Sequence, residues 1–325
     1  MLVEGLAARG HEVTLWAAPG SRIPGELVPY GVPPHIGMTR RIRELVQVAS
    51  PLWRRRGEFD IVHSFGRLAA LLPILPLAIP KVQSYQRQIT PRSVRWGARL
   101  AGSSLLFTAC STAVRRDVSH MGRWATVYNG APASRYSFVG TVADAAPLVF
   151  LGRVERIKGP HTAIAVARAS GRRLVIAGNV PEEHRGFFGN EIAPHVDGDR
   201  VKYVGPVNDE AKNELLGGAA ALLMPVEWDE PFGIVMAEAL ACGTPVIGLR
   251  RGAVPEVVEE GVTGFVCDTG EEMAVAVGRL AAIERRACRD RFERLFSDHA
   301  IVEAYLTVYK REIAGAPGRH NGDHV

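Results

Sequence analysis

The stretch EPFGIVMAEALACGTPV, residues 230–246, decides the fold of the second half of this chain. We expect a buried strand just before it, at Ala221–Pro225, followed by a loop. A helix then begins at Gly233, because apolar residues recur there every three or four positions. Another strand is expected at Pro245–Leu249. This strand–helix–strand order predicts a parallel β-sheet covered by helices.

The remainder of the second half repeats the same alternation. Short apolar runs typical of buried parallel strands are separated by segments with helical periodicity. The other expected strands are Leu148–Val154, Arg173–Gly178, Val201–Gly205 and Gly264–Cys267, and the expected helices are Pro160–Ser170, Asp209–Ala219, Gly233–Cys242, Val254–Glu260 and Glu271–Ala282. In a sheet of this kind, ligands bind beyond the carboxyl ends of the strands.

The first half shows this pattern less regularly. Its expected strands are Val13–Ala17, Ile61–Ser64, Lys81–Tyr85, Leu105–Cys110 and Ala125–Tyr128. The polar segment Ala133–Ala146 has no periodicity and is our candidate for an interdomain linker, and a last helix is expected at Ala300–Ile313. We therefore predict an N-terminal α/β domain over residues 1–140, a C-terminal one over residues 141–300, and a helix with a loose tail over residues 301–325.

The composition is that of an ordinary globular protein. Hydrophobic residues make up 47% and charged residues 22% of the 325 residues, which excludes a disordered or fibrous chain. The formal charge of +5 and the isoelectric point of 9.2 suit nucleic acid, an anionic membrane surface or a phosphorylated small molecule as partner. Because no lysine-rich run or aromatic–basic stripe occurs, we expect no nucleic-acid partner.

The cysteines and the apolar runs indicate a cytoplasmic protein. The four cysteines lack the spacing of a zinc site or a disulfide framework, so we expect buried free thiols. The most apolar run, Leu68–Pro80, is interrupted by prolines and is shorter than the ~20 residues that span a membrane. The N-terminus lacks the charged and apolar regions of a signal peptide. The basic and apolar segment Arg40–Arg56 leaves two interpretations open, a solvated surface or peripheral contact with an anionic inner membrane face.

The start of the helix at Gly233 is a candidate phosphate site. The first backbone N–H groups of a helix are free and its dipole is positive there, so both favour an anion. Gly233 has no side chain and lets a phosphate approach the backbone. Glu230 precedes the helix and Glu238 lies one to two turns into it, so the two carboxylates flank the phosphate position. Carboxylates in these places suit hydroxyl groups of a sugar on one side and of a ribose on the other.

A second candidate phosphate contact is GRVERIKG, residues 152–159, which directly follows an expected strand. Gly152 opens this loop, and Arg153 and Lys158 supply two cations that can neutralise a diphosphate. Taken alone, the pattern is also compatible with an exposed basic loop that binds no ligand.

The second half resembles the donor domain of the family 4 glycosyltransferases, which are retaining enzymes with the GT-B fold. The resemblance rests on the GR…KG loop, on the E-x7-E motif within EPFG…EALACGTPV, and on the segments at residues 252–258 and 261–265. It runs from about Leu148 to Ile313 and is thinner at residues 60–64 and 127–130. It implies an α/β protein with two Rossmann-like domains, whose parallel sheets face a cleft.

The resemblance also implies residue roles. Arg153 and Lys158 would hold the donor diphosphate and stabilise the leaving group. Glu230 would contact the transferred sugar, and Glu238 the ribose hydroxyls. Backbone contacts to the donor are expected at Gly152, Gly233, Ile234 and Val235. Members of this family need no metal and no other cofactor. Their acceptor attacks from the front face with help from the diphosphate, so we nominate no nucleophile and no side-chain base.

The first half departs from this family in two places. Family members usually begin with a strand and a glycine-rich loop before the helix that here ends near Gly10, so we expect the N-terminal domain to lack its first, central strand. Where relatives often carry a histidine near the sugar, this chain has Lys81–Arg87. His63 stands alone where some relatives have two histidines, and it suits a structural role as well as a functional one.

The sequence thus predicts transfer of a sugar from a nucleoside-diphosphate sugar to an acceptor. A truncated or non-catalytic nucleotide-sugar-binding protein of the same fold is the main alternative, and a GT-B epimerase or phosphorylase is a further one. Whether the acceptor is a glycan, a lipid-linked group or a small molecule stays open. The sequence does not indicate the base or sugar of the donor, or the oligomeric state.

Overall fold

The structure, a computed structural model, describes the backbone of residues 1–30 and 38–316, and the side chains of this part except those of residues 38–45. The chain forms two compact units. Unit 1 comprises Met1–Val127 and Ile301–Val325, and unit 2 comprises Tyr128–Ala300. Each unit contains parallel strands and helices, as predicted.

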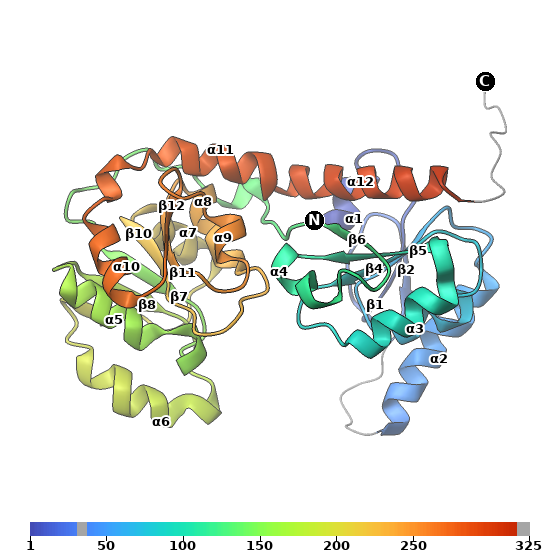
Figure 1. Ribbon diagram of the computed structural model, residues 1–325, viewed down its shortest axis with the longest axis horizontal. Helices are drawn as coiled ribbons and strands as arrows, with labels where there is room; N and C mark the ends of the chain where they lie inside the picture. The colour runs from blue at the N-terminus through green and yellow to red at the C-terminus, as the bar shows by residue number, and fades with distance from the viewer. Residues whose placement is uncertain (31–37, 317–325) are drawn as a thin grey trace. The chain divides into compact units, whose positions relative to one another are not determined.

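Unit 2 is built on one sheet of six parallel strands (Figure 1). The strands are β7 (Leu148–Leu151), β8 (Leu174–Ala177), β9 (Val201–Tyr203), β10 (Ala221–Met224), β11 (Val246–Leu249) and β12 (Gly264–Cys267). The α-helices of this unit are α5 (Pro160–Ala169), α6 (Arg185–Phe187), α7 (Asp209–Gly217), α8 (Ile234–Ala241), α9 (Val254–Val257), α10 (Gly270–Val277) and α11 (Arg285–Leu295). All six predicted strands are confirmed, whereas α6 and α11 are additions to the predicted elements.

The order of the strands in unit 2 marks a place for a ligand. Across the sheet the order is β12-β11-β10-β7-β8-β9, so the chain builds outward from β7 in one direction and from β10 in the other. The neighbouring strands β7 and β10 therefore form a topological switch point. In open α/β sheets, a ligand binds in the crevice beyond the carboxyl ends of the strands at such a point.

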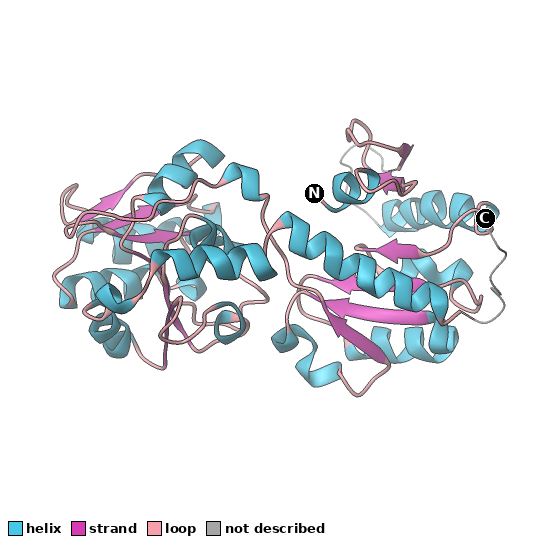
Figure 2. Ribbon diagram, turned by 90° about the horizontal axis from the view of Figure 1, so that it is seen from above, coloured by secondary structure: helices cyan, strands magenta, loops and turns pink. Residues whose placement is uncertain are grey.

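Unit 1 contains two separate parallel sheets instead of one. The smaller sheet pairs β1 (Thr14–Ala17) with β2 (Glu26–Pro29), and the larger has the order β3 (Val62–Ser64), β4 (Lys81–Tyr85), β5 (Leu105–Ala109) and β6 (Arg123–Thr126). The helices are α1 (Leu2–Ala7), α2 (Met38–Arg54), α3 (Pro91–Ala101), α4 (Thr112–Arg115) and most of α12 (Asp298–Ala314). Figure 2 shows helices packed against the strands of this unit.

The division between the units differs from the predicted boundary at residues 140 and 141. Residues 128–140 belong to unit 2, because Tyr128 packs edge to face against Phe296 at 5.4 Å and Val139 N–H donates to Cys242 O at 3.0 Å. The segment Ala133–Ala146 is therefore a packed part of unit 2 and not a free linker. The last strand of unit 1, β6, begins at Arg123, earlier than the predicted Ala125, and ends at Thr126, before the predicted Tyr128.

Burial agrees with the expectations for the apolar runs. All four cysteines are buried, and none of them forms a disulfide bond. Among the described residues, no helix is both long and apolar enough to cross a bilayer.

A buried lysine in unit 1 predicts that stability depends on pH. Lys81 is fully buried, and its Nζ donates to Leu77 O at 2.6 Å and to Ile79 O at 2.7 Å. Burial lowers the pKa of Lys81 from 10.5 to about 8. Above that pH the folded protein loses a proton that the unfolded chain still binds, so the free energy of unfolding rises between about pH 8 and 10.5.

Urea denaturation at several pH values within this window measures the effect. We expect the rise to be smaller in Lys81→Met, which has no proton to lose. The exposed Lys202→Met should keep the rise of the wild type. Equal pH dependence in Lys81→Met and wild type would contradict the assignment.

Candidate functional site

Two loops meet at the switch point of unit 2. One follows β7 and covers residues 152–159, and the other follows β10 and leads to Gly233. Glu227 N–H donates to Ile157 O at 2.9 Å and joins them. Gly159 has φ +75°, and a Cβ there would lie 2.0 Å from Pro225 O. Only glycine fits this close approach, which holds the two loops together.

Lys158 and Glu230 come together where these loops meet. Lys158 Nζ contacts Glu230 Oε2 at 2.5 Å, and Trp228 Nε1 donates to the same oxygen at 3.0 Å. The ammonium group also stands 4.8 Å from the centre of the Trp228 ring. Glu230 is 7% exposed, and its backbone is held by Ala253 N–H, which donates to Glu230 O at 2.9 Å. The two charges, 72 positions apart in the sequence, thus form one partly buried ion pair.

The start of α8 presents free backbone donors beside this pair. Gly233 is the N-cap residue with φ 70° and ψ 69°, and no side chain caps this end. The N–H groups of Ile234 and Val235 are in the first turn, where a helix offers them no partner. A Cβ on Gly233 would lie 3.2 Å from Glu230 Cγ, which shows how closely Glu230 adjoins the helix start. Lys158 and Glu230 therefore lie beside the start of α8, and the roles expected of them toward a donor stay predictions.

Arg153 is not part of this cluster. Its guanidinium pairs with Glu155 Oε1 at 2.8 Å, and its side chain is 53% exposed. Gly152, next to it, is packed against the loop after β8, because its carbonyl oxygen would lie 1.8 Å from a Cβ on Gly178. The predicted contact of Arg153 with the diphosphate therefore stays a prediction.

Glu238 lies in a second cluster, on the side of α8 that faces α7. Tyr136 O–H donates to Glu238 Oε1 at 2.7 Å, and Lys212 Nζ contacts the same oxygen at 2.7 Å. Glu238 is 8% exposed. Sequence reasoning misses both partners, because Tyr136 falls in the segment interpreted as a linker and Lys212 looks like a solvated residue of a surface helix.

His63 has a structural role in unit 1. Its Nδ1 bonds Tyr309 Oη at 2.5 Å and its Nε2 bonds Ser84 Oγ at 2.6 Å. Burial lowers the pKa of His63 to about 3, so the ring is neutral. These bonds tie β3 and β4 to α12, so the structural interpretation of His63 has direct support. The Lys81–Arg87 segment contributes Ser84 to the same network.

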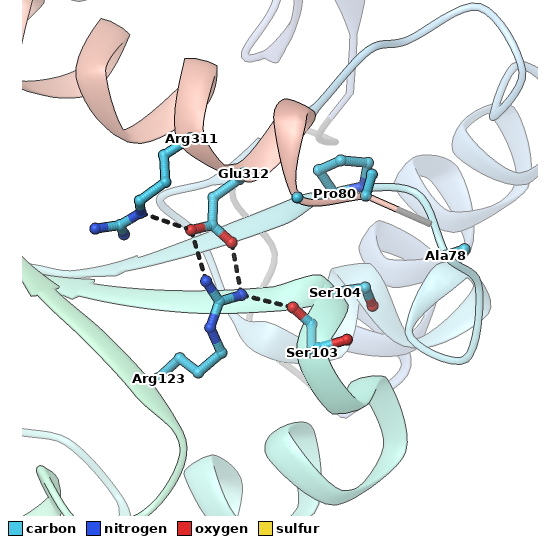
Figure 3. A pocket seen from close by; sticks show the side chains of 9 residues that line it. Ala78, Pro80, Ser103, Ser104, Arg123, Arg311 and Glu312 are labelled. Atoms are coloured by element: carbon cyan, nitrogen blue, oxygen red, sulfur yellow. Dashed lines mark hydrogen bonds and ion pairs between the residues drawn. The ribbon is translucent and has the colours of Figure 1, made fainter. Parts of the chain in front are cut away.

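A cavity of about 190 Å³ in unit 1 is lined by Arg123, Arg311 and Glu312, among other residues (Figure 3). Glu312, 6% exposed, accepts two hydrogen bonds from Arg123 at 2.7 and 2.8 Å and one from Arg311 at 3.1 Å. Both carboxylate oxygens of Glu312 are therefore already bonded to guanidinium groups, and we assign the cavity no ligand. Among the described residues no group of His, Cys, Asp and Glu could hold a metal ion.

Comparison with known proteins identifies the family of this chain. Residues 1–135 match the family Glycosyltransferase Family 4, and residues 140–294 match the family Glycosyl transferases group 1. A D-inositol 3-phosphate glycosyltransferase of Saccharomonospora viridis is 30% identical over 210 residues, which cover 58% of this chain and 48% of that protein. In that alignment the chain spans about half the length of the curated relative.

Two further proteins are similar over more of their length. A glycogen synthase of Mycobacterium tuberculosis is 30% identical over 77% of this chain and 68% of its own. The crystal structure of AviGT4, a glycosyltransferase involved in avilamycin A biosynthesis, is 28% identical with a TM-score of 0.69, and the match covers 97% of this chain and 88% of that one. The two family matches, the parallel sheets and the E-x7-E motif agree, and this chain belongs to the family 4 glycosyltransferases of the GT-B fold.

Proposed function

We propose that this protein is a retaining glycosyltransferase that takes a sugar from a nucleoside-diphosphate sugar. The observation that carries the proposal is the partly buried Lys158–Glu230 pair beside the uncapped start of α8, at the switch point of the sheet. A cation, a carboxylate and free backbone N–H groups at one place suit a ligand that combines a diphosphate with hydroxyl groups.

The same residues suggest how the reaction proceeds. The diphosphate binds at the N–H groups of Gly233, Ile234 and Val235, and Lys158, with Arg153 from the same loop, neutralises the charge that develops as the sugar leaves. Glu230 Oε1 accepts a hydroxyl of the sugar while Oε2 stays with Lys158. The bond from the anomeric carbon to the phosphate oxygen breaks, and the acceptor hydroxyl bonds to the same face. Its proton passes to the leaving diphosphate, so no side-chain nucleophile takes part.

Binding and product analysis test this function. We expect one of UDP-, GDP- or ADP-glucose, or the corresponding nucleoside diphosphate, to raise the melting temperature, because it binds only the folded state. With an acceptor, release of the diphosphate and an anomeric configuration equal to that of the donor should be seen by NMR. Inversion would contradict the retaining mechanism. Binding without turnover, over a panel of glycan, lipid-linked and small acceptors, would favour the non-catalytic alternative.

We also propose that unit 1 contacts an anionic membrane surface through α3. Arg92, Arg95, Trp96, Arg99 and Leu100 form one exposed face of this helix, and Trp96 is 55% exposed. α3 has no acidic residue. Residues 1–127 contain 17 Lys or Arg and 7 Asp or Glu, a formal charge of +10, whereas residues 128–300 contain 19 and 24, a charge of −5. A basic helix with exposed aromatic and aliphatic side chains suits such a surface.

This surface differs from the one expected at Arg40–Arg56. That segment lies largely in α2, and the side chains of its residues 40–45 are outside the described part. At its end Trp53 is 43% exposed, with the Arg56 guanidinium 4.2 Å from its ring centre. α3 is therefore the part of unit 1 on which the proposal rests.

Vesicle sedimentation tests the role of α3. Replacing Arg92, Arg95 and Arg99 together with glutamine should weaken binding to vesicles rich in phosphatidylglycerol by roughly 100-fold, since each arginine near the surface contributes about 1 kcal/mol. The matched triple variant of the exposed Arg185, Arg286 and Arg294 should bind like the wild type. Equal binding of both triple variants would contradict a role for α3.

A further inference from the structure

The contacts of Glu238 occupy only one of its two carboxylate oxygens. Oε1 accepts from Tyr136 O–H and from Lys212 Nζ, each at 2.7 Å, and the Lys212 ammonium stands 5.5 Å from the centre of the Tyr136 ring. For Oε2 the described residues provide no hydrogen bond or ion pair. Glu238 nevertheless keeps 8% of its surface exposed. One oxygen is thus held in place and the other is left for a further partner.

Glu230, eight positions earlier, is held in the same way. Its Oε2 is occupied by the Lys158 ammonium and by Trp228 N–H, and this ammonium also stands over the ring of its aromatic partner. Its Oε1 has no such bond within the described residues. Each glutamate of the E-x7-E motif therefore has a clamp, which we define as one lysine and one aromatic hydrogen-bond donor on a single carboxylate oxygen. The repetition of this arrangement at both glutamates argues against a chance surface ion pair.

The clamp at Glu238 has little freedom to move. The Tyr136 backbone is held by Arg289, whose guanidinium donates to Tyr136 O at 3.0 Å, and the next residue donates its N–H to Asn213 Oδ1 at 2.9 Å. Burial raises the pKa of Tyr136 to about 12, so the phenol keeps its proton and stays a donor. Burial would lower the pKa of Lys212, but its bonds to Glu238 and Tyr136 outweigh this and raise it, so the lysine remains a cation.

We propose that Tyr136 and Lys212 are positioning residues, which hold Glu238 Oε1 so that Oε2 accepts hydrogen bonds from the ribose diol of the nucleotide. The proposal rests on the function proposed above. A carboxylate that rotates freely loses conformational entropy when a diol binds it, whereas a clamped one is already oriented. The clamp would thus keep Glu238 oriented for the ribose contact that the family resemblance implies.

Calorimetry with matched nucleotides tests this assignment. The probes are UDP, GDP and ADP, each compared with its 2′-deoxy form. For the nucleotide that binds, we expect the wild type to prefer the ribose form about 10–100-fold. This is the gain in affinity, about 10–100-fold, that one hydrogen bond to a charged group provides. In Tyr136→Phe and Lys212→Met this ratio should fall towards one, while the affinity for the deoxy form changes little. Lys212→Arg should restore part of the ratio.

A variant of the other clamp provides the control. Trp228→Phe keeps an aromatic ring but loses the N–H that Glu230 accepts. It should leave the ratio of ribose to deoxyribose binding at the wild-type value and weaken the preference for a nucleotide sugar over the free nucleotide. Tyr136→Phe removes a single hydroxyl, and its melting temperature shows whether it is folded.

The outcomes separate this inference from the proposed function. If none of the three nucleotides binds the wild type, the donor function itself fails. A second outcome is that the wild type prefers the ribose form while Tyr136→Phe and Lys212→Met keep the full ratio of ribose to deoxyribose binding. In that case the clamp is only structural and the inference is overturned. If Glu238→Gln also keeps the ratio, Glu238 does not read the ribose, and the inference is overturned at its starting point.

Discussion

Replacing Lys158 with methionine is expected to lower kcat roughly 100- to 1000-fold, the usual loss when one group that stabilises developing charge is removed. Methionine keeps the length of the side chain and removes the charge beside Glu230. The negative charge on the leaving diphosphate then depends on the start of α8 and on Arg153 alone. Initial rates of nucleotide release, at saturating donor and acceptor, measure the change.

The same loop offers a matched control for Lys158. Arg156 lies two residues earlier, its side chain is 52% exposed and it pairs with Glu191 outside the cluster. Arg156→Met should keep the rate within a few-fold. Because Lys158 and Glu230 are in contact, we expect the fold-loss of rate in the double variant Lys158→Met with Glu230→Gln to be smaller than the product of the two single fold-losses. A double fold-loss equal to that product would contradict a joint role.

Replacing Gly159 with alanine is expected to lower the free energy of unfolding by about 2–4 kcal/mol. A left-handed backbone costs an alanine about 1 kcal/mol, and overpacking of a tight contact adds about 1–3 kcal/mol. Here the new Cβ would lie 2.0 Å from the backbone oxygen of Pro225, which is fixed at the end of β10. The loop that carries Lys158 must then shift, so donor affinity should fall together with stability. Urea denaturation and nucleotide binding measure both effects.

Gly171→Ala separates the two contributions to this loss. Gly171 also has a left-handed backbone, φ +67°, but no atom lies within 4 Å of the position of its added Cβ. The free energy of unfolding of Gly171→Ala should fall only by the cost of backbone strain, about 1 kcal/mol, and this variant should bind nucleotide like the wild type. Equal losses in Gly171→Ala and Gly159→Ala would show that the contact with Pro225 has no energetic weight.

The central part of the site is predictable from sequence because of strand topology. Lys158 and Glu230 each follow a buried strand, and the carboxyl ends of parallel strands lie at one edge of a sheet. The uncapped helix start at Gly233 is likewise visible in the sequence, since a glycine precedes an apolar run of helical spacing. Local patterns are sufficient for these features, because each depends on residues close to one another along the chain.

Elements with weak local patterns are missed. β2, with the sequence ELVP, is only four residues long and ends in a proline. α11 contains five arginines in eleven residues and buries only Cys288 and Phe292, so its sequence resembles a solvated segment. Neither has the apolar periodicity by which strands and helices are recognised. Their positions depend on what they pack against.

The amino-acid order was enough to predict the parallel sheet of unit 2 with its six strands, and to place Lys158 and Glu230 each in a loop after a strand. These follow from hydrophobic periodicity and glycine placement, which act over a few residues. The assignment of residues 128–140 to unit 2, the pairing of Arg153 with Glu155 and the clamp on Glu238 depended on the folded chain. Glu238 lies on α8, whereas Tyr136 and Lys212 come from two other segments. Only the packing of those two segments against α8 brings the polar atoms within hydrogen-bonding distance.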